Sequence, residues 1–414
     1  MTGTTPDRAT GSTANTDGAT PGPLDGIRVV DLASVVMGPY AARILGDLGA
    51  EVVKIEPPTG DVMRQLHKRR ENGLGALMLN LNRNKRSAAL DLKSPAGHRA
   101  ALDIIADADV LITNMRPRAL KKLGLTYDDL AEANPRLVYC QAAGFRADSR
   151  YADRAAYDEV IQSTSGMVDL MRRATGKPSY VPTVLADKVC GLAIVQGVMA
   201  ALLARVRTGR GQRVEVPMAD TMFAFTLLEH IGGRAFEPPH GDVGFPRSLA
   251  PGHEALPTKD GYACILPYSI ANVRAFFTEV GRADLHDDPR FADRASMSLH
   301  IGELYELIGQ HTPERTTREW ESFCADASIP FAPVLDLDRA GEHEYWAEGG
   351  MLAVTDHPTE GLYRLIGSPL AFSDTPTSLR RHCPELGQHT DEVLTELGYT
   401  DEQLAAVRTR GAGA

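Results

Sequence analysis

Short hydrophobic runs alternate with longer amphipathic stretches through the first half of the chain. The short runs predict buried strands, and the amphipathic stretches between them predict helices. Strands that alternate with helices favour a parallel sheet wrapped by helices, and therefore an α/β fold. The strands expected in this half of the chain are 27–32, 51–56, 87–92, 109–113, 136–143 and 212–217.

The pattern changes after residue 217, and this change predicts a second, smaller domain. A helix is expected at 218–235, a Gly/Pro-rich loop at 238–257 and a strand at 261–268. Charged helical stretches follow, then a connector at 329–337 and a return to the sheet at 362–372. We therefore expect a disordered tail at 1–22, the first part of a large domain at 23–217, a linker with the small domain at 218–330, and a return linker with the last part of the large domain at 331–414.

The longest apolar stretch covers 189–206 and is rich in Ala and Gly. Its length is borderline for a membrane span, and the chain has no second stretch of this kind. We therefore expect a buried helix and no membrane anchor. Residues 1–22 are rich in Thr, Gly, Ala and Pro without an apolar run, which is not the pattern of a signal peptide.

Composition narrows the class of protein further. The formal net charge of -10 argues against a general nucleic-acid binder, which needs a broad basic face. Five scattered cysteines without metal-binding spacing indicate reduced thiols and a cytoplasmic location. The histidines lack HExxH spacing, so no metal is expected, and the absence of GxGxxG and P-loop motifs weakens nicotinamide and ATP readings.

Asp187 stands directly before the apolar stretch, in "VLADKVCG". A helix N-cap is the common role of such a residue. The same position also suits a catalytic carboxylate, because free N–H groups and the helix dipole stabilise an anion there. Carboxylates act as nucleophiles in covalent catalysis, so the residues alone leave both roles open.

Two basic clusters suit a ligand with separated phosphates, although a solvated charge run is the ordinary explanation of each. The first cluster lies beside a predicted strand and the second follows another. An acidic protein with such clusters at strand ends has the means to clamp one phosphorylated ligand. The clusters contain Arg83, Lys85 and Arg86, and Arg116, Arg118, Lys121 and Lys122.

Six segments in order, from about Pro23 to about residue 405, make the chain similar to the class III CoA-transferases. They are "LDGIRVVDLASVVMGPYAARILGDLGAEVVKIEPPTGD", "LNRNKRSAALDLK", "ADVLITNMRP", "AAYDEVIQSTSG", "VLADKVCG" and "LLARVRTGRGQRVEVPMAD". The resemblance implies a Rossmann-like large domain built from both chain ends, a smaller α+β domain and an interlocked homodimer.

The resemblance also implies a reaction and its residues. The substrates are an acyl-CoA and a carboxylic acid, and no cofactor is needed beyond the CoA thioester itself. Asp187 is the implied nucleophile, which forms an aspartyl anhydride and then an aspartyl-CoA thioester. The residues implied to lie near the acyl group or to hold CoA are Val35, Val36, Met37, Leu90, Lys93, Asn114, Met115, Lys122 and Tyr157.

Two alternatives remain beside the transferase. An α-methylacyl-CoA racemase needs two acid/base groups, but Tyr157 occupies the position of the racemase histidine, and a free Tyr is a poor base near neutral pH. A non-catalytic CoA-binding protein would not require Asp187. Val36 and Met37 stand where the formyl-CoA transferases carry Gln and Ser, Pro57 replaces an Arg, and 247–262 lacks their glycine-rich lid. We therefore expect an acyl group larger and less polar than formyl or oxalyl.

Overall fold

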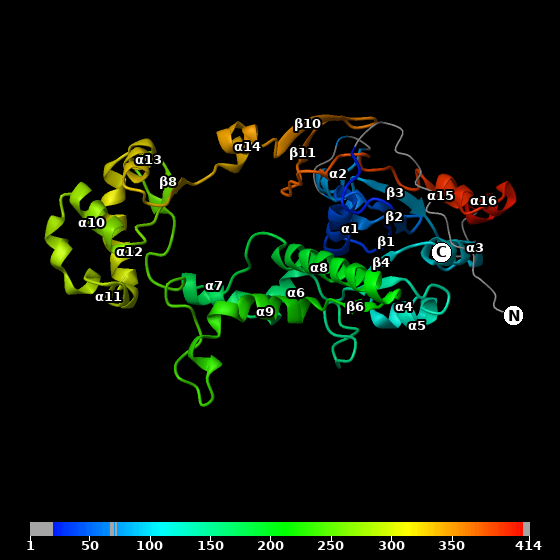
Figure 1. The fold of residues 1–414 in the computed structure, drawn as a ribbon, viewed down its shortest axis with the longest axis horizontal. Helices are drawn as coiled ribbons and strands as arrows, with labels where there is room; N and C mark the ends of the chain where they lie inside the picture. Colours follow the sequence, from blue (N-terminus) through cyan, green and yellow to red (C-terminus); the bar gives the residue numbers. More distant parts are fainter. Residues whose placement is uncertain (1–19, 67–69, 71–72, 409–414) are drawn as a thin grey trace. The chain divides into compact units, whose positions relative to one another are not determined.

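The computed structural model describes residues 20–66, 70 and 73–408; of the tail predicted at 1–22, residues 1–19 lie outside them. A six-stranded sheet organises the larger part of the chain (Figure 1). All its strand pairs are parallel, which confirms the predicted parallel α/β sheet. Its spatial order is β3-β2-β1-β4-β5-β6, the order of a doubly wound Rossmann-like sheet. The strands are β1 (Arg28–Leu32), β2 (Glu51–Glu56), β3 (Lys85–Ala89), β4 (Val110–Thr113), β5 (Val138–Gln141) and β6 (Arg213–Glu215).

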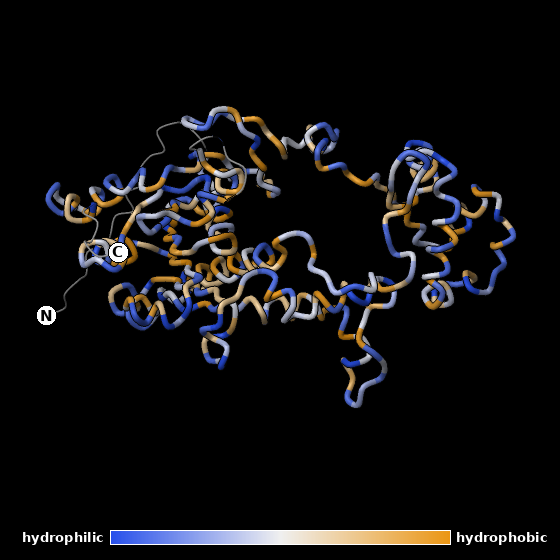
Figure 2. Tube along the Cα trace, turned by 180° about the vertical axis from the view of Figure 1, so that it is seen from behind, coloured by the Kyte–Doolittle hydropathy of each residue, from blue (hydrophilic) through white to orange (hydrophobic). Residues whose placement is uncertain are grey.

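Successive side chains of each strand point to opposite faces of the sheet, and both faces are buried. One face, with Val30, Val53 and Leu111, packs against α3, α4, α5, α15 and α16. The other face carries α1 and the long helix α8, which pack against each other. Figure 2 shows the apolar residues concentrated along the strands and α8. The helices of this part are α1 (Met37–Asp47), α2 (Ala76–Leu81), α3 (Pro95–Ala106), α4 (Pro117–Leu123), α5 (Tyr127–Leu130), α6 (Asp158–Thr164), α8 (Leu185–Thr208), α15 (Thr390–Glu396) and α16 (Asp401–Arg408).

The edge strand β3 begins at Lys85, two residues before the expected 87–92. The carboxyl-terminal segment covers this edge: the His389 N–H donates to the Ser87 carbonyl at 2.9 Å, and the Ala89 N–H donates to the Thr390 hydroxyl at 3.0 Å. An exposed edge would leave these strand groups unpaired. The return of the chain therefore closes the sheet edge at β3.

The predicted return to the sheet at 362–372 is wrong in its partner. Residues Gly361–Ile366 form β11, which pairs antiparallel with β10 (Leu352–His357) as a separate hairpin. The predicted connector at 329–337 contains a strand, β9 (Phe331–Pro333). The first error arises because a short apolar run predicts a strand but does not identify the strand beside it.

The chain divides into two compact units. The first takes the described residues up to Ser165, Pro182–Phe223 and those from Gly349 on; the second takes Gly166–Val181 and Ala224–Glu348. The second unit has an antiparallel sheet β7-β8-β9 and a core in which the Trp320 and Phe276 rings stack 5.5 Å apart. Its further elements are α7 (Met167–Thr175), β7 (Leu256–Pro257), β8 (Tyr262–Ile265), α10 (Ile270–Glu279), α11 (Arg294–Leu299), α12 (Ile301–His311), α13 (Thr317–Asp326) and α14 (Glu344–Glu348), while α9 (Met218–His230) crosses the boundary.

Helix α8 corresponds to the apolar stretch 189–206. Among the described residues it is the one helix long and apolar enough to cross a membrane, and 39% of its most apolar 18-residue stretch is buried. One such helix is weak evidence for a membrane span, because core helices meet the same criterion. Ile194 and Val198 are fully buried, whereas Leu203 is 64% and Val206 is 82% exposed. The expectation of a buried helix therefore holds for one face only.

Candidate active site

A pocket opens where the carboxyl ends of the central strands meet. Doubly wound sheets bind ligands at this edge, beside the point where the strand order reverses. In this sheet that point lies between β1 and β4. Ser34–Met37 follow β1, Asn114 follows β4, Ala142–Gly144 follow β5, and Met218 follows β6. Strand topology alone thus brings distant segments of the chain to one site.

The cavity has an empty volume of about 370 Å³, which includes its open mouth. Six residues expected at the site line it: Val35, Val36, Met37, Asn114, Tyr157 and Asp187. Sequence reasoning missed the others. These are Ser34, Ala142, Ala143, Gly144, Ala156 and Met218.

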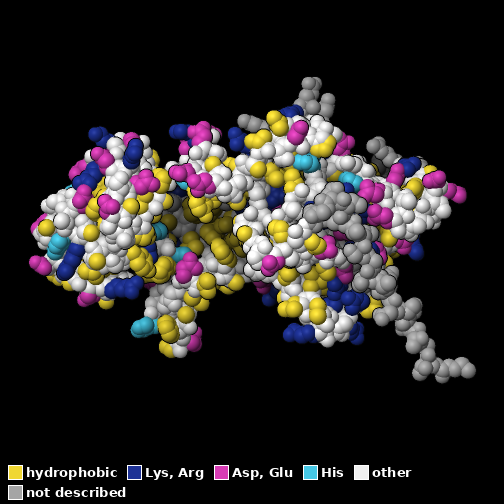
Figure 3. All heavy atoms as spheres, turned by 45° about the horizontal axis from the view of Figure 1, so that its top comes forward, with side chains coloured by type: hydrophobic (Ala, Val, Ile, Leu, Met, Phe, Trp, Pro, Cys, Tyr) yellow, Lys and Arg dark blue, Asp and Glu magenta, His cyan; other side chains and the backbone are white. Residues whose placement is uncertain are grey.

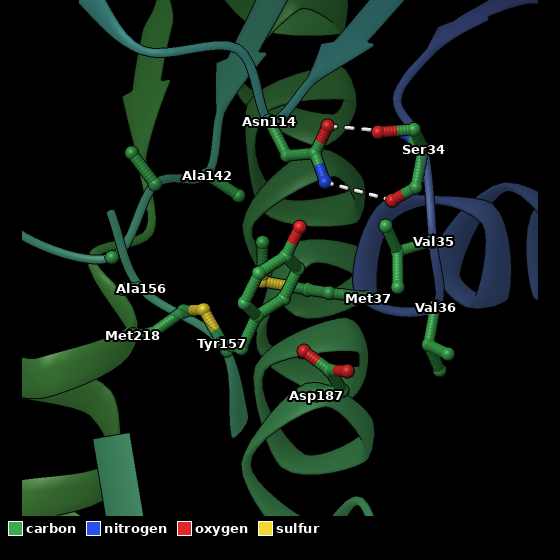
Figure 4. Close-up of a pocket in the computed structure, with 12 residues that line it drawn as sticks. Ser34, Val35, Val36, Met37, Asn114, Ala142, Ala156, Tyr157, Asp187 and Met218 are labelled. Atoms are coloured by element: carbon green, nitrogen blue, oxygen red, sulfur yellow. Dashed lines mark hydrogen bonds between the residues drawn. The ribbon is translucent and has the colours of Figure 1, made fainter. Parts of the chain in front are cut away.

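The Asp187 side chain points into the pocket from the first turn of α8 (Figure 4). The N-cap of this helix is Val184, and no side chain caps it locally. Instead, the Asp158 carboxylate accepts a hydrogen bond from the Asp187 N–H at 3.1 Å. A residue of α6 therefore satisfies the amide that a local cap would have bound. The cap interpretation of Asp187 is excluded, and its carboxylate is left for another role.

Burial, together with the nearby charges of Asp158 and Glu159, raises the pKa of Asp187 to about 7. The residues lining the pocket include no Arg or Lys to oppose this shift. A carboxylate in such a place is more basic than usual, and perturbed carboxyl groups of this kind mark functional sites. Asp187 therefore has the electrostatic character of a reacting group.

Gly191 brings α8 close to the start of α1, one turn after Asp187. A Cβ atom at this position would lie 2.8 Å from Tyr40 Cδ1 and 3.0 Å from the Met37 carbonyl oxygen. The first distance is a steric clash, and the second is tighter than most contacts of a real Cβ atom. The absence of a side chain thus lets Asp187 face the segment that ends at Met37.

Asn114 and Tyr157 lie on the opposite side of the pocket from Val36 (Figure 4). The Asn114 amide bonds both backbone groups of Ser34: its Nδ2 donates to the Ser34 carbonyl at 2.8 Å, and its Oδ1 accepts from the Ser34 N–H at 3.1 Å. Tyr157 is 65% exposed, so its ring is free to meet a ligand. Asn114 shapes the pocket wall, whereas Tyr157 stands at its mouth.

The structure corrects the predicted phosphate clamp at Arg83, Lys85 and Arg86. Lys85 is fully buried, and its Nζ lies 2.8 Å from the Asp31 carboxylate. Arg83 is also buried and pairs with Asp47 at 2.7 Å. The Arg86 guanidinium pairs with Glu396 at 2.7 Å on the opposite face of β3. Arg83 and Lys85 are neutralised by buried carboxylates, so neither has access to a phosphate.

The remaining predicted CoA contacts lie outside the pocket lining. The Leu90 side chain is fully buried in the core, which removes it as a direct contact, and Met115 packs partly against the same core. Lys93 and Lys122 are exposed, the first just before α3 and the second on α4. These two cations remain accessible, and so does the rest of the second basic cluster.

The pocket at the strand ends thus holds a carboxylate with a raised pKa that does not cap its own helix. CoA-transferase family III matches residues 24–390. The chain belongs to this family. Its members act on acyl-CoA and carboxylate substrates, and the protein is an enzyme of the CoA-transferase class.

Two relatives and one solved structure show how far the similarity extends. The formyl-CoA:oxalate CoA-transferase of Streptomyces avermitilis is 32% identical over 415 residues, which cover 94% of this chain and 98% of that protein. The succinate–glutarate CoA-transferase of Agrobacterium fabrum is 30% identical, with 91% and 96% covered. The crystal structure of a CAIB/BAIF family protein from Brucella suis has a TM-score of 0.78 and 29% identity, and covers 92% of this chain and 100% of that one. This CoA-transferase therefore shares nearly its full length with its relatives.

Proposed function

We propose that this CoA-transferase moves CoA from an acyl-CoA donor to a carboxylic acid acceptor, with Asp187 as covalent nucleophile. The observation that carries the proposal is the environment of the Asp187 carboxylate. This carboxylate faces the pocket, no Arg or Lys lines that pocket, and the carboxylate does not cap helix α8. An oxygen with a raised pKa is a stronger nucleophile once it is ionised.

An Asp187 oxygen attacks the thioester carbonyl of the donor, the C–S bond breaks, and a mixed anhydride forms with release of CoA thiolate. The thiolate attacks the Asp187 carbonyl, which expels the donor acid and leaves an aspartyl-CoA thioester. The acceptor carboxylate displaces the thiolate to form a second anhydride. The thiolate then attacks the acceptor carbonyl, which yields the new acyl-CoA and restores Asp187.

The pocket walls support a donor larger and less polar than formyl or oxalyl. Val35, Val36 and Met37 form one wall, with Met218 on another, and none of these side chains donates a hydrogen bond. A polar acyl oxygen left unpaired there would cost about 1–3 kcal/mol. Methionine also adapts its shape to varied apolar chains. A dicarboxylic donor would find no cation among the lining residues for its distal charge.

We propose a homodimer as the working form, as the resemblance implies. Exposed apolar side chains on α8 support the proposal, because Leu203 and Val206 project from a face that the single chain leaves uncovered. Figure 3 shows further apolar side chains reaching the surface among interspersed charges. Sedimentation equilibrium at micromolar concentration tests the proposal, and a monomer there would remove it.

The test of the reaction follows oxygen rather than only rate. The purified protein is incubated with a panel of acyl-CoAs and with acceptor acids labelled with ¹⁸O in the carboxylate, and products are read by mass spectrometry. The proposed steps leave one acceptor oxygen on Asp187, so the peptide that contains it gains about 2 Da, the mass difference between the two oxygen isotopes. A racemase would instead exchange the α-proton with solvent, and a CoA-binding protein would do neither. Transfer without label on Asp187 would contradict the covalent role.

A further inference from the structure

Val35 adopts a backbone conformation that its side chain disfavours. Its φ is +70°, and among the described residues it is the one β-branched residue with a positive φ. Such residues are genuine outliers, and they persist only where the surroundings enforce them. Val35 also lines the pocket, in the segment that faces Asp187. The strain therefore lies in the pocket wall itself.

Side chains hold the two residues that precede this strained position. The Ala33 N–H donates to Asp31 at 3.1 Å, and Lys54 Nζ donates to the Ala33 carbonyl at 2.7 Å. The next residue, Ser34, exchanges two hydrogen bonds with Asn114. Each backbone group of this stretch thus has its own side-chain partner.

The Val35 N–H completes the series by donating to both oxygens of Asp61, at 3.3 and 3.2 Å. Asp61 is itself fixed: it is 4% exposed, and its carboxylate lies 3.2 Å from Lys54 Nζ. The same carboxylate accepts from the Met63 N–H at 3.0 Å, and the Asp61 N–H donates to Glu56 at 3.1 Å. A buried ion pair therefore supplies the acceptor that holds Val35 in its conformation.

We propose that Asp61 is a positioning residue for the transfer reaction. Its carboxylate holds Val35 in the left-handed conformation and thereby fixes the wall Val35–Met37 against Asp187. Asp61 does not line the pocket, so it acts through the backbone that it binds. This inference rests on the proposed function, because it assigns to Asp61 the fit between the pocket wall and the acyl group.

The test compares discrimination between acyl groups. The wild-type ratio of kcat/KM for a branched acyl-CoA over acetyl-CoA is measured first, then that of Asp61→Asn. Asn keeps the shape but loses the charge, and a hydrogen bond to a charged group is worth about tenfold in an equilibrium or rate. We expect the ratio to fall about tenfold, with a smaller change in the affinity for free CoA, because Asp61 contacts neither substrate.

Asp47→Asn is the matched control. Asp47 is an equally buried acid, paired with Arg83, at the far end of α1 and outside the pocket. It should lower the melting temperature and leave the discrimination ratio unchanged. If Asp61→Asn and Asp47→Asn alter the ratio alike, or if neither alters it, the inference is overturned.

A double variant guards against misfolding of Asp61→Asn. Lys54→Met with Asp61→Leu removes both charges of the pair together, which buried ion pairs tolerate far better than the loss of one partner. The Asp31–Lys85 pair remains to hold the sheet. This double variant should also lose the discrimination, and wild-type discrimination in it would refute the inference. A wild-type protein that transfers no CoA at all would instead remove the proposed function, a separate failure.

Discussion

Two carboxylates of the same unit, the buried Glu56 and the half-buried Asp187, have opposite electrostatic environments. Burial alone would raise the pKa of Glu56, but the Arg64 hydrogen bonds and the Lys54 and Arg64 charges outweigh it and lower this pKa to about 2. The Arg64 guanidinium lies 2.6 Å from Glu56. Burial also raises the pKa of Asp187, and there the neighbours are acidic and add to the shift, so this pKa reaches about 7. The cation, present in one place and absent in the other, separates a structural carboxylate from a reactive one.

The two carboxylates therefore affect stability with opposite signs. The Glu56 pKa is depressed, so its contribution is present above its unfolded value of about 4.5 and is lost as the pH falls towards 2. The Asp187 pKa is raised, so ionising it costs folded-state stability as the pH rises from about 4 to about 7. At neutral pH, ionised Glu56 therefore stabilises the folded protein, whereas ionisation of Asp187 destabilises it.

The largest effect is expected from Asp187→Ala. It removes the nucleophile, so transfer should fall by at least about 10³-fold, while CoA binding measured by calorimetry persists. Glu159→Gln is the control, because it alters a nearby charge without touching the nucleophile. Near-normal turnover in Asp187→Ala would show that the Asp187 carboxylate has no covalent role.

Glu56→Gln should be the most destabilising change outside the pocket. It leaves Arg64 buried without its bidentate partner, and loss of one member of a buried pair costs about 3–5 kcal/mol. Urea unfolding at neutral pH measures this cost. Glu396→Gln, which breaks the more exposed pair with Arg86, should cost about 1 kcal/mol or less. Equal costs would mean that burial does not distinguish the two pairs.

The same contrast explains what the sequence could predict. Mostly apolar runs located β1, β2, β4 and β5, because strands buried on both faces are rich in apolar residues. They misplaced β3, whose first residue is Lys85: a buried charge resembles a loop residue until its partner Asp31 is known. The basic run at 83–86 was assigned to a ligand for the same reason, since its carboxylate partners are distant in sequence.

The candidate site was predictable only where local motif or family resemblance marked it. Asp187 stood out at a helix start, and the resemblance brought Val35–Met37, Asn114 and Tyr157. Asp158 had no recognised role, because it binds the Asp187 N–H from another helix. The residues after β5 and β6 have small or apolar side chains without a chemical signature. Strand order was the signal that could have found them, since it sends every strand end to one edge.

Asp158→Asn should move the pH profile more than the maximal rate. The variant keeps an oxygen to accept the Asp187 N–H but removes a like charge, so the pKa of Asp187 should fall from about 7. Because the ionised form reacts, the acidic limb of kcat/KM should shift to lower pH by about one unit. Glu159→Gln, the weaker of the two acidic neighbours, should shift it less. An unchanged limb would show that another group controls the profile.

The smallest expected effects belong to the exposed cations, and they separate binding charges from structural ones. Lys93→Gln and Lys122→Gln should each raise the KM for acyl-CoA about two- to fivefold, because an exposed charge pair is worth about 1 kcal/mol at most. The effect should fade at high salt, since exposed charges are screened. Arg83→Gln should have the opposite effect. Arg83 is buried and cannot contact CoA, so KM should stay constant, whereas Asp47 loses its 2.7 Å partner, so the stability of the protein should drop. Steady-state kinetics at two salt concentrations, paired with urea unfolding of the same three variants, measures both quantities. A raised KM in Arg83→Gln at unchanged stability would restore the phosphate clamp that the buried ion pair excludes.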